Sequence, residues 1–251
     1  MRALSAAELL DVWEAGRDQA PVGRALALLA AACPETPPDR LAALSIGRRD
    51  AQLMTLRAWT FGSAVAGVAS CPACGDRLDF GFDLEEIRVE APSATEPIVV
   101  QAAGWEVRCR LPSSADLLAV AALPRDGDML ALAGPSRRQW LLERCIVAAE
   151  LDGESRPTGD LPPELLADVV RALGEADAQA DVELALTCPG CDHGWSAAFE
   201  VASFFWSELG TWAARTLREV HALAMAYGWP ESEILALSPR RRQAYLELIE
   251  G

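Results

Sequence analysis

The chain contains Cys71-Pro72-Ala73-Cys74 and, much later, Cys188-Pro189-Gly190-Cys191, two copies of one Cys-x-x-Cys motif. The likeness continues past the cysteines, because an ungapped alignment places Phe82 on Phe199 within an alternation of apolar and polar residues. Such an alternation is typical of a half-buried strand. We interpret the two stretches as an internal repeat of about fifteen residues. Each copy is predicted to be a β-hairpin with a cysteine pair at its tip.

The two cysteine pairs together have the composition of a structural zinc site. A structural zinc ion takes four ligands in a tetrahedron, so two thiolates from one hairpin leave it two ligands short. Bringing both tips together would complete the set with Cys71, Cys74, Cys188 and Cys191. The sequence therefore predicts one Cys₄ site and a structural zinc ion (Zn²⁺) as cofactor.

The spacing of the pairs departs from the usual zinc ribbon, since residues 75 to 187 lie between them. A ribbon commonly has about fifteen to twenty residues there. Closing the longer loop costs about 1.6 kcal/mol more than closing a loop of about 18 residues, whereas a structural zinc contributes about 10 to 16 kcal/mol. Zinc binding outweighs the loop cost, so we interpret the segment as an insertion with its own strands and helices.

Other interpretations of the cysteines remain open at this point. A redox dithiol would start a helix after a strand, and a catalytic zinc would keep an open coordination position. His193 could replace a cysteine or form a hydrogen bond with a thiolate. The remaining cysteines, Cys33, Cys109 and Cys145, lie among apolar residues and are expected to be buried and inert.

Hydrophobic periodicity and helix caps predict an α+β fold. Two zinc-knuckle β-hairpins form the ribbon-like Cys₄ site, with a mixed strand and helix insertion and flanking helices that include a long C-terminal amphipathic helix. The expected segments are an N-terminal helical segment (1–62), the first hairpin (63–84), the insertion (85–181), the second hairpin (182–201) and a C-terminal helical module (202–251).

Within the insertion, the pattern predicts strands over 98–102 and 105–111, joined by a tight turn. Helices are expected to start at Ser113, at Ser136 and at the Pro162-Pro163 pair. The helix that starts at Ser136 is expected to include Ile146.

Composition excludes several function classes. The 251 residues are 51% hydrophobic with a net charge of −15, and all 22 basic residues are arginine. A chain without lysine has no Walker A lysine and no Schiff-base amine, and a net negative charge repels a phosphate backbone. We therefore expect a protein that is not an enzyme and does not bind nucleic acid. No apolar run reaches the about 18 residues of a membrane span, and no secretory signal is present, so we expect a cytoplasmic protein without membrane insertion.

The C-terminal part is rich in aromatic residues and arginine. One interpretation is a core stripe on the long helix. Another is a docking surface, because Trp, Tyr and Arg dominate interface hot spots. Its candidate partner-binding residues are Tyr227, Trp229, Arg240, Arg241 and Tyr245. A third interpretation, helix-turn-helix DNA binding, is opposed by the net charge.

The closing segment, YGWPESEILALSPRRRQAYL at residues 227–246, resembles that of the baseplate hub assembly chaperone family of T4-like phages. It is also similar to proteins encoded with phage-tail-like contractile injection systems. In that family a Tyr-x-Trp turn is followed by an Ile-Leu pair and an Arg-x-x-Tyr-Leu helix. The two Cys-Pro-x-Cys hairpins and Phe204-Phe205-Trp206 are similar to the larger members that carry zinc knuckles. The resemblance is good over 182–250, fair over 45–84 and weak in the insertion.

The resemblance implies a non-enzymatic role in assembling the baseplate or hub of a contractile tail, with baseplate and hub proteins as partners. One alternative is a permanent structural component of the same particle. A further alternative is a zinc-ribbon regulator that binds nucleic acid.

Overall fold

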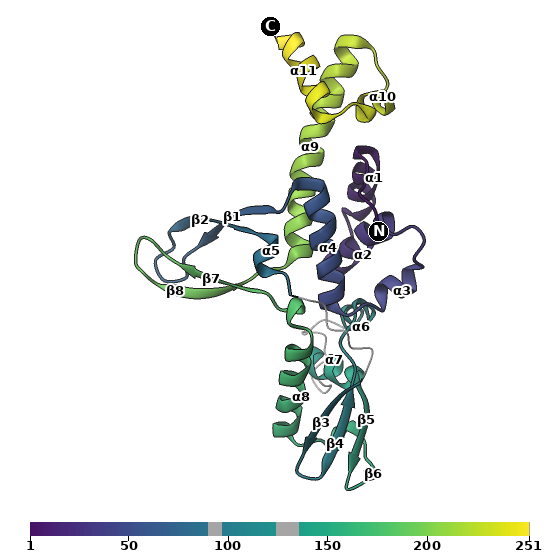
Figure 1. Ribbon diagram of the computed structural model, residues 1–251, viewed down its shortest axis with the longest axis vertical. Helices are drawn as coiled ribbons and strands as arrows, with labels where there is room; N and C mark the ends of the chain where they lie inside the picture. The colour runs from purple at the N-terminus through teal and green to yellow at the C-terminus, as the bar shows by residue number, and fades with distance from the viewer. Residues whose placement is uncertain (90–96, 124–135, 251) are drawn as a thin grey trace. The chain divides into compact units, whose positions relative to one another are not determined.

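The computed structural model describes residues 1–89, 97–123 and 136–250 (Figure 1). The chain forms two compact units, one made of Met1–Glu35 with Val201–Gly251 and the other of Thr36–Glu200. Among the described residues, no helix is both long enough and apolar enough to cross a bilayer. The mixed α and β class expected from the sequence is observed, with small antiparallel sheets and a long C-terminal helix.

The first unit is helical. Its elements are α1 (Ala6–Gly16), α2 (Pro21–Ala32), α9 (Val201–Tyr227), α10 (Glu231–Ala236) and α11 (Pro239–Glu250). The helix α1 begins with a capping box in which Glu8 N donates to Ser5 Oγ and Ser5 N donates to Glu8 Oε2, which satisfies N–H groups that the helix itself leaves unpaired. The apolar stripe of α9 is largely core, since Phe205 and Leu209 are fully buried.

The described residues of the second unit form helices and three antiparallel sheets. It begins with α3 (Pro38–Ala42) and α4 (Ile46–Phe61), followed by the hairpin of β1 (Ala64–Ser70) and β2 (Arg77–Asp83) and by α5 (Leu84–Ile87). The unit ends with the hairpin of β7 (Glu183–Thr187) and β8 (Gly194–Ala198). Both predicted hairpins are therefore present, each as a two-stranded sheet.

Between the hairpins lies a four-stranded sheet with helices. Its elements are β3 (Ile98–Ala102), β4 (Trp105–Cys109), α6 (Ser114–Ala121), α7 (Arg137–Cys145), β5 (Ile146–Leu151), β6 (Glu154–Ser155) and α8 (Pro163–Ala176). The strands are ordered β3-β4-β5-β6. The predicted tight turn is confirmed at Ala103 and Gly104, where φ is 50° and 83°. Positive φ at both central residues gives a turn whose twist matches the strands it joins.

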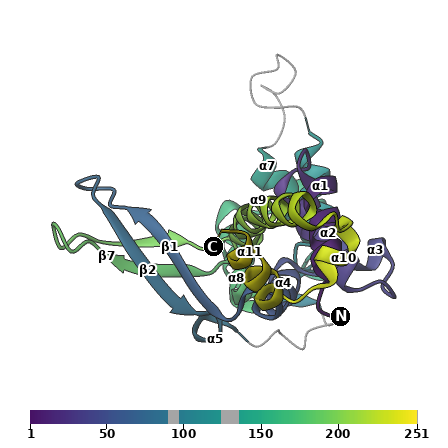
Figure 2. The same cartoon turned by 90° about the horizontal axis from the view of Figure 1, so that it is seen from above.

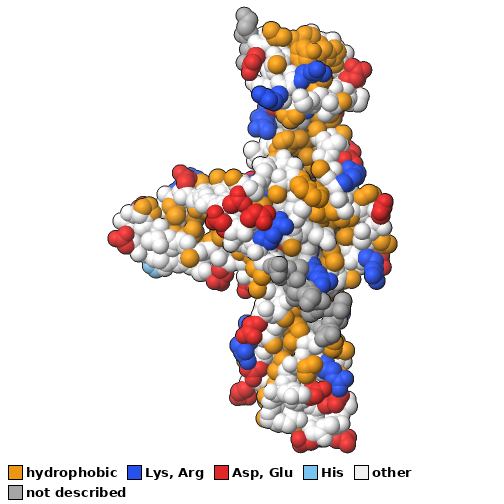
Figure 3. Space-filling model, viewed as in Figure 1, with side chains coloured by type: hydrophobic (Ala, Val, Ile, Leu, Met, Phe, Trp, Pro, Cys, Tyr) orange, Lys and Arg blue, Asp and Glu red, His pale blue; other side chains and the backbone are white. Residues whose placement is uncertain are grey.

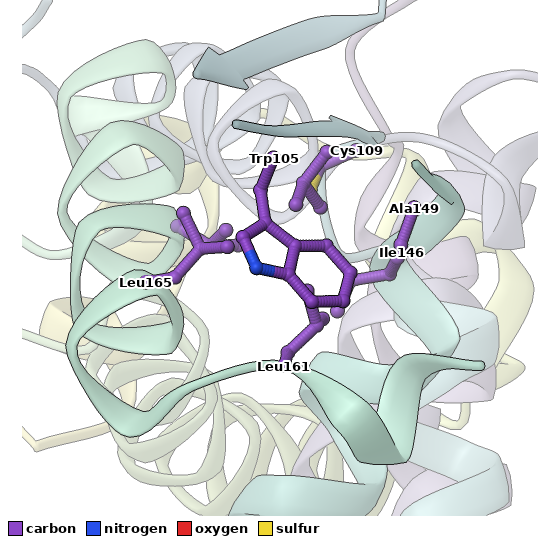
Figure 4. Packing of buried hydrophobic residues seen from close by; sticks show 8 residues of the cluster. Trp105, Cys109, Ile146, Ala149, Leu161 and Leu165 are labelled. Carbon is purple, nitrogen blue, oxygen red and sulfur yellow. The ribbon is translucent and has the colours of Figure 1, made fainter. Parts of the chain in front are cut away.

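The inserted sheet has its own hydrophobic core (Figure 4). Trp105 lies at its centre and packs in one cluster with Leu161, Leu165, Ile146 and Ala149. The other face of the sheet carries an ion-pair row, in which Arg108 contacts Glu106 at 3.0 Å and Glu150 at 2.9 Å. This division into an apolar and a charged face is expected of an antiparallel sheet covered on one side.

The structure corrects one strand boundary and one helix boundary of the insertion. The prediction that Ile146 continues the helix is wrong, because its backbone is extended (φ −79°, ψ 117°) and it starts β5, paired with Cys109. The run Ile146–Leu151 contains helix-forming Ala and Glu, so its pairing with β4 decides its conformation. The strand predicted to end at 111 ends at Cys109.

The first hairpin also ends earlier than its alternating pattern predicts. Leu84 continues the apolar alternation, yet it begins the short helix α5. The Asp83 side chain accepts a hydrogen bond from Glu85 N at 3.0 Å. Such a cap satisfies a free helix N–H group and so favours a helix start.

Substituting Gly47 with alanine is expected to destabilise the second unit. The Gly47 N–H donates to the buried carboxylate of Asp177 at 3.0 Å, and a Cβ at position 47 would lie 2.0 Å from Asp177 Oδ1 and 3.0 Å from Ala180 N. Moving the carboxylate would break this buried hydrogen bond, at a cost of about 2 to 3 kcal/mol. Unfolding in urea measures this loss in the free energy of unfolding.

A matched control is Gly174→Ala in α8, where an added Cβ meets nothing within 4 Å. It is expected to stabilise the protein by about 0.5 to 1 kcal/mol, because alanine loses less conformational freedom than glycine on helix formation. Equal effects of the two substitutions would contradict the close approach at Gly47.

Candidate metal centre

The strand registers place both cysteine pairs at hairpin tips. Strand β1 pairs with β2 as far as Ser70 and Arg77, and β7 pairs with β8 as far as Thr187 and Gly194. The first cysteine of each pair therefore directly follows its strand. Both hairpins lie side by side in two perpendicular views (Figures 1 and 2).

The two turns use the same hydrogen bonds. In the first turn, Cys71 N donates to Asp76 O at 2.8 Å and Gly75 N donates to Cys71 O at 2.9 Å. The second turn has the same two bonds, from Cys188 N to His193 O and from Asp192 N to Cys188 O, both at 2.9 Å. The repeat seen in the sequence is therefore also a repeat of backbone conformation.

The turns share a left-handed residue after the second cysteine. Gly75 has φ 81° and Asp192 has φ 56°. Glycine adopts this conformation without strain, and aspartate is among the few other residues that tolerate it. The two positions differ in sequence but carry residues suited to the same backbone.

Aromatic packing joins the hairpins away from the tips. The rings of Phe82 and Phe199 make an edge-to-face contact with centroids 5.2 Å apart. Within the first hairpin, Phe80 lies over Gly67, where an added Cβ would approach the ring to 2.5 Å. Edge-to-face pairs of this kind are worth about 0.5 to 1.5 kcal/mol beyond the area that they bury. The aromatic contact alone is a small contribution to holding two hairpins together.

At the tips, four sulfur atoms converge. The Sγ atoms of Cys71 and Cys191 lie 3.7 Å apart, those of Cys74 and Cys188 lie 3.6 Å apart, and all four lie within 4.8 Å of one another. These separations exceed a disulfide bond of about 2.05 Å. They are close to the about 3.8 Å between ligands of a tetrahedral ion with bonds of about 2.3 Å. The four cysteines could therefore hold a metal ion.

The thiols at the tips influence one another. Burial raises the pKa of the Cys71 thiol, but hydrogen bonds from the backbone of Cys74 and Ala73 and from neighbouring thiols outweigh burial and lower this pKa to about 6. The Ala73 N–H lies 3.4 Å from Cys71 Sγ. A backbone hydrogen bond from Asp76 lowers the pKa of Cys74, but the other thiols raise it to about 12. One thiolate thus forms readily, and adjacent thiols resist further ionisation until a cation offsets the charge.

The other sulfur and imidazole groups lie apart from this cluster. His193 is exposed and stacks on Trp195 with ring centroids 6.2 Å apart, and the cluster of potential ligand atoms contains only the four cysteines among the described residues. Cys33, Cys109 and Cys145 are buried free thiols, as expected. Burial raises the pKa of both Cys109 and Cys145 to about 11, which leaves these two thiols uncharged and unreactive.

The five candidate partner-binding residues divide into two groups in the first unit. Tyr227, Trp229 and Tyr245 form an aromatic cluster, with centroids 4.7 Å apart for Tyr227 and Trp229 and 4.9 Å apart for Trp229 and Tyr245. Trp229 and Tyr245 also pack against a core cluster, whereas Tyr227 is 38% exposed. Arg240 and Arg241 are exposed near the start of α11.

Comparison with protein families gives a match to the model described as T4 bacteriophage base plate protein, over residues 3–206. This range contains both hairpins, the inserted sheet and the start of α9. The chain belongs to the T4 bacteriophage base plate protein family. No curated protein and no solved structure shows a significant match.

Membership of the base plate protein family confirms the T4-like phage resemblance and implies other base plate proteins as partners. The range of the match differs from the range of the sequence resemblance. The resemblance is strongest towards the C-terminus, whereas the family match ends at residue 206, before α10 and α11. The match also includes the insertion, where the resemblance is weak.

Sequence reasoning found the four cysteines but missed a second group of functional interest, a buried aspartate flanked by two arginines. Asp116 accepts hydrogen bonds from Arg110 Nη1 at 2.6 Å and from Arg144 Nε at 3.0 Å. The capping pattern of Ser113 and Asp116 is readable from the sequence. The approach of the two arginines depends on the packing of α6 against α7 and on the backbone hydrogen bond from Arg110 N to Cys145 O, and it is not readable from the sequence.

Proposed function

We propose that this base plate family protein is a non-enzymatic adaptor or assembly chaperone for the baseplate and hub of a contractile, phage tail-like injection system. The observation that carries the proposal is the family match. In this proposal a zinc ion stabilises the two hairpins, and the C-terminal helices provide a docking end for baseplate proteins.

The choice of zinc rests on the ligand set. Four thiolates favour zinc or iron–sulfur chemistry over oxygen-preferring ions such as magnesium and calcium. The sulfur separations fit one tetrahedral ion, and two of the four cysteines, Cys71 and Cys188, are buried. A closed set of four thiolates provides structural stabilisation and leaves no open coordination position for catalysis.

The non-enzymatic role rests on the chemistry of the chain. Both histidines, His193 and His221, are exposed, and among the described residues neither imidazole is oriented for proton transfer by a side-chain hydrogen bond. Burial raises the pKa of the Cys109 and Cys145 thiols to about 11, which keeps both thiols protonated. A protein of this kind is expected to act by binding partners.

The docking end is supported by exposure and charge. A space-filling view shows hydrophobic side chains over the end that carries α10 and α11, with both basic and acidic side chains beside them (Figure 3). Tyr227 is 38% exposed beside the stacked Trp229, and Arg240 and Arg241 are exposed. Arg242 differs, because it is buried and contacts Glu219 at 3.1 Å. The proposed contact residues are therefore Tyr227, Arg240 and Arg241, with Trp229 and Tyr245 supporting them from the core side.

Changing the exposed residues is expected to abolish partner binding without unfolding the chain. The triple variant Tyr227→Ser, Arg240→Glu, Arg241→Glu should lower capture of co-expressed baseplate proteins from neighbouring genes at least about tenfold, since hot-spot truncations cost about 2 kcal/mol or more. Quantitative pull-down measures this, with circular dichroism to check the fold.

The matched control is Arg218→Glu, a charge reversal at an exposed position of α9 in the same unit. It is expected to leave capture unchanged. Unchanged capture by the triple variant would contradict the docking end. Recovery of the chain at constant stoichiometry in purified particles would favour the alternative of a permanent structural component.

A further inference from the structure

A pocket in the second unit has a basic lining in an acidic protein. It has a volume of about 820 Å³ and lies where α3 and the starts of α4 and α6 meet β3, β5 and the end of α7. Four arginines and one aspartate line it, although the chain as a whole carries a net charge of −15. The volume is within the range of about 300 to 1,000 Å³ that is usual for ligand pockets.

A buried carboxylate holds two of these arginines in place. Asp116 accepts from both Nη atoms of Arg110, at 2.6 and 2.8 Å, and from Arg144 Nε at 3.0 Å. The Asp116 side chain is 2% exposed, whereas those of Arg110 and Arg144 are 43% and 39% exposed. The single negative charge of Asp116 thus orients two guanidinium groups that remain partly exposed in the pocket. Asp116 accepts from Nε of Arg144 and not from its two Nη groups.

The orienting carboxylate is ionised in the folded protein. Burial raises the pKa of Asp116, but hydrogen bonds from Arg110 and Ser113 outweigh burial and hold it well below its usual range. The charged form of the group is therefore favoured, and this form accepts the hydrogen bonds of the two arginines.

Further positive charge comes from Arg40 and from two helix ends. Arg40, in the last turn of α3, is exposed and forms no ion pair with any described residue. Ser45 and Ser113 cap the N-termini of α4 and α6, line the pocket and are joined by a β-bridge. Helix N-termini carry partial positive charge, which adds to that of the guanidinium groups.

The rest of the lining is apolar and includes Leu44, Pro97, Ile98, Leu111 and Val147. Val147 is 64% exposed, so this wall offers apolar surface to a ligand. A ligand that suits the whole pocket combines negative charge with apolar side chains. An acidic peptide segment has both, whereas the phosphate backbone of a nucleic acid carries no aliphatic side chains to place against this apolar wall.

We infer that this pocket binds an acidic, leucine-containing segment of a partner protein through Arg40, Arg110 and Arg144. Arginine recognises carboxylates by paired N–H donors in a planar fork. Both Nη atoms of Arg110 already donate to Asp116, so Arg110 contributes mainly positive charge, whereas Asp116 contacts Arg144 through Nε and leaves its two Nη groups for such a contact. This binding site lies in a different unit from the proposed docking end and does not depend on it.

The test uses a fluorescein-labelled peptide of alternating leucine and glutamate, with fluorescence anisotropy on the full chain. The peptide is expected to bind, and a matched peptide with glutamine in place of glutamate is expected to bind about tenfold more weakly. Arg40→Glu should weaken binding of the glutamate peptide about tenfold. Arg138→Glu, an exposed position of α7 that does not line the pocket, should leave it unchanged.

Three results would overturn the inference. The first is no binding of the glutamate peptide up to about 1 mM, a limit that corresponds to only about 4 kcal/mol of binding energy. The second is equal binding of the glutamate and glutamine peptides, or of the wild type and Arg40→Glu. The third is complete displacement of the peptide by a single-stranded oligothymidylate, which would assign the pocket to nucleic acid.

Discussion

Replacing Cys188 with serine is expected to unfold the paired hairpins while the inserted sheet stays folded. An isolated two-stranded hairpin is marginally stable in water, and the edge-to-face contact of Phe82 and Phe199 adds only about 0.5 to 1.5 kcal/mol. A bound structural zinc contributes about 10 to 16 kcal/mol, so removing one of four ligands removes most of what joins the hairpins. Treating the wild type with a zinc chelator should have the same effect.

Hydrogen exchange followed residue by residue measures this local unfolding. Amides of β1, β2, β7 and β8 should lose protection in Cys188→Ser, while those of β4 and β5 keep it. Cys33→Ala is the control, because Cys33 is a buried thiol of the other unit, and it should leave the hairpin amides protected. Full protection of the hairpins in Cys188→Ser would show that metal binding does not stabilise them.

Truncating Trp105 to alanine is expected to destabilise the inserted sheet by about 3 to 5 kcal/mol. The side chain is 8% exposed and packs in one cluster with Leu161 and Leu165, so its removal both exposes apolar neighbours to water and leaves a cavity. The metal content should not change, since the cysteines belong to the hairpin tips. Urea unfolding monitored by circular dichroism gives the loss of stability.

The control for this truncation is Trp59→Ala in α4, where the tryptophan is 50% exposed. Its effect is expected to stay within about 1 kcal/mol, as is usual for surface substitutions. A loss below about 1 kcal/mol for Trp105→Ala as well would mean that the insertion does not depend on a core of its own.

Much of the local structure was predictable because its causes are local. The Ser5 and Glu8 capping box, the turn at Ala103 and Gly104 and the alternation that ends at Phe82 each depend on residues that are close in the sequence. The repeated motif also predicted that two equivalent turns would carry the cysteines. The sequence could associate the distant pairs because a four-coordinate metal needs both.

Features that depend on tertiary contacts were not predictable. The strand β5 follows α7 without a break, and its residues form a strand because β4 offers a partner. The same packing brings Arg110 and Arg144 to Asp116. No short-range pattern in the sequence predicts that these side chains meet, because nothing near Arg110 or Arg144 in the sequence distinguishes them from other surface arginines.

The central claim is that one zinc ion, bound by all four thiolates, holds the two hairpins together. Elemental analysis of the full chain, purified without chelator, tests it most directly. The account predicts about one zinc per chain, and zinc lost from both Cys71→Ser and Cys188→Ser but retained in Cys33→Ala. Protein that is folded at both hairpins and contains no metal would contradict it.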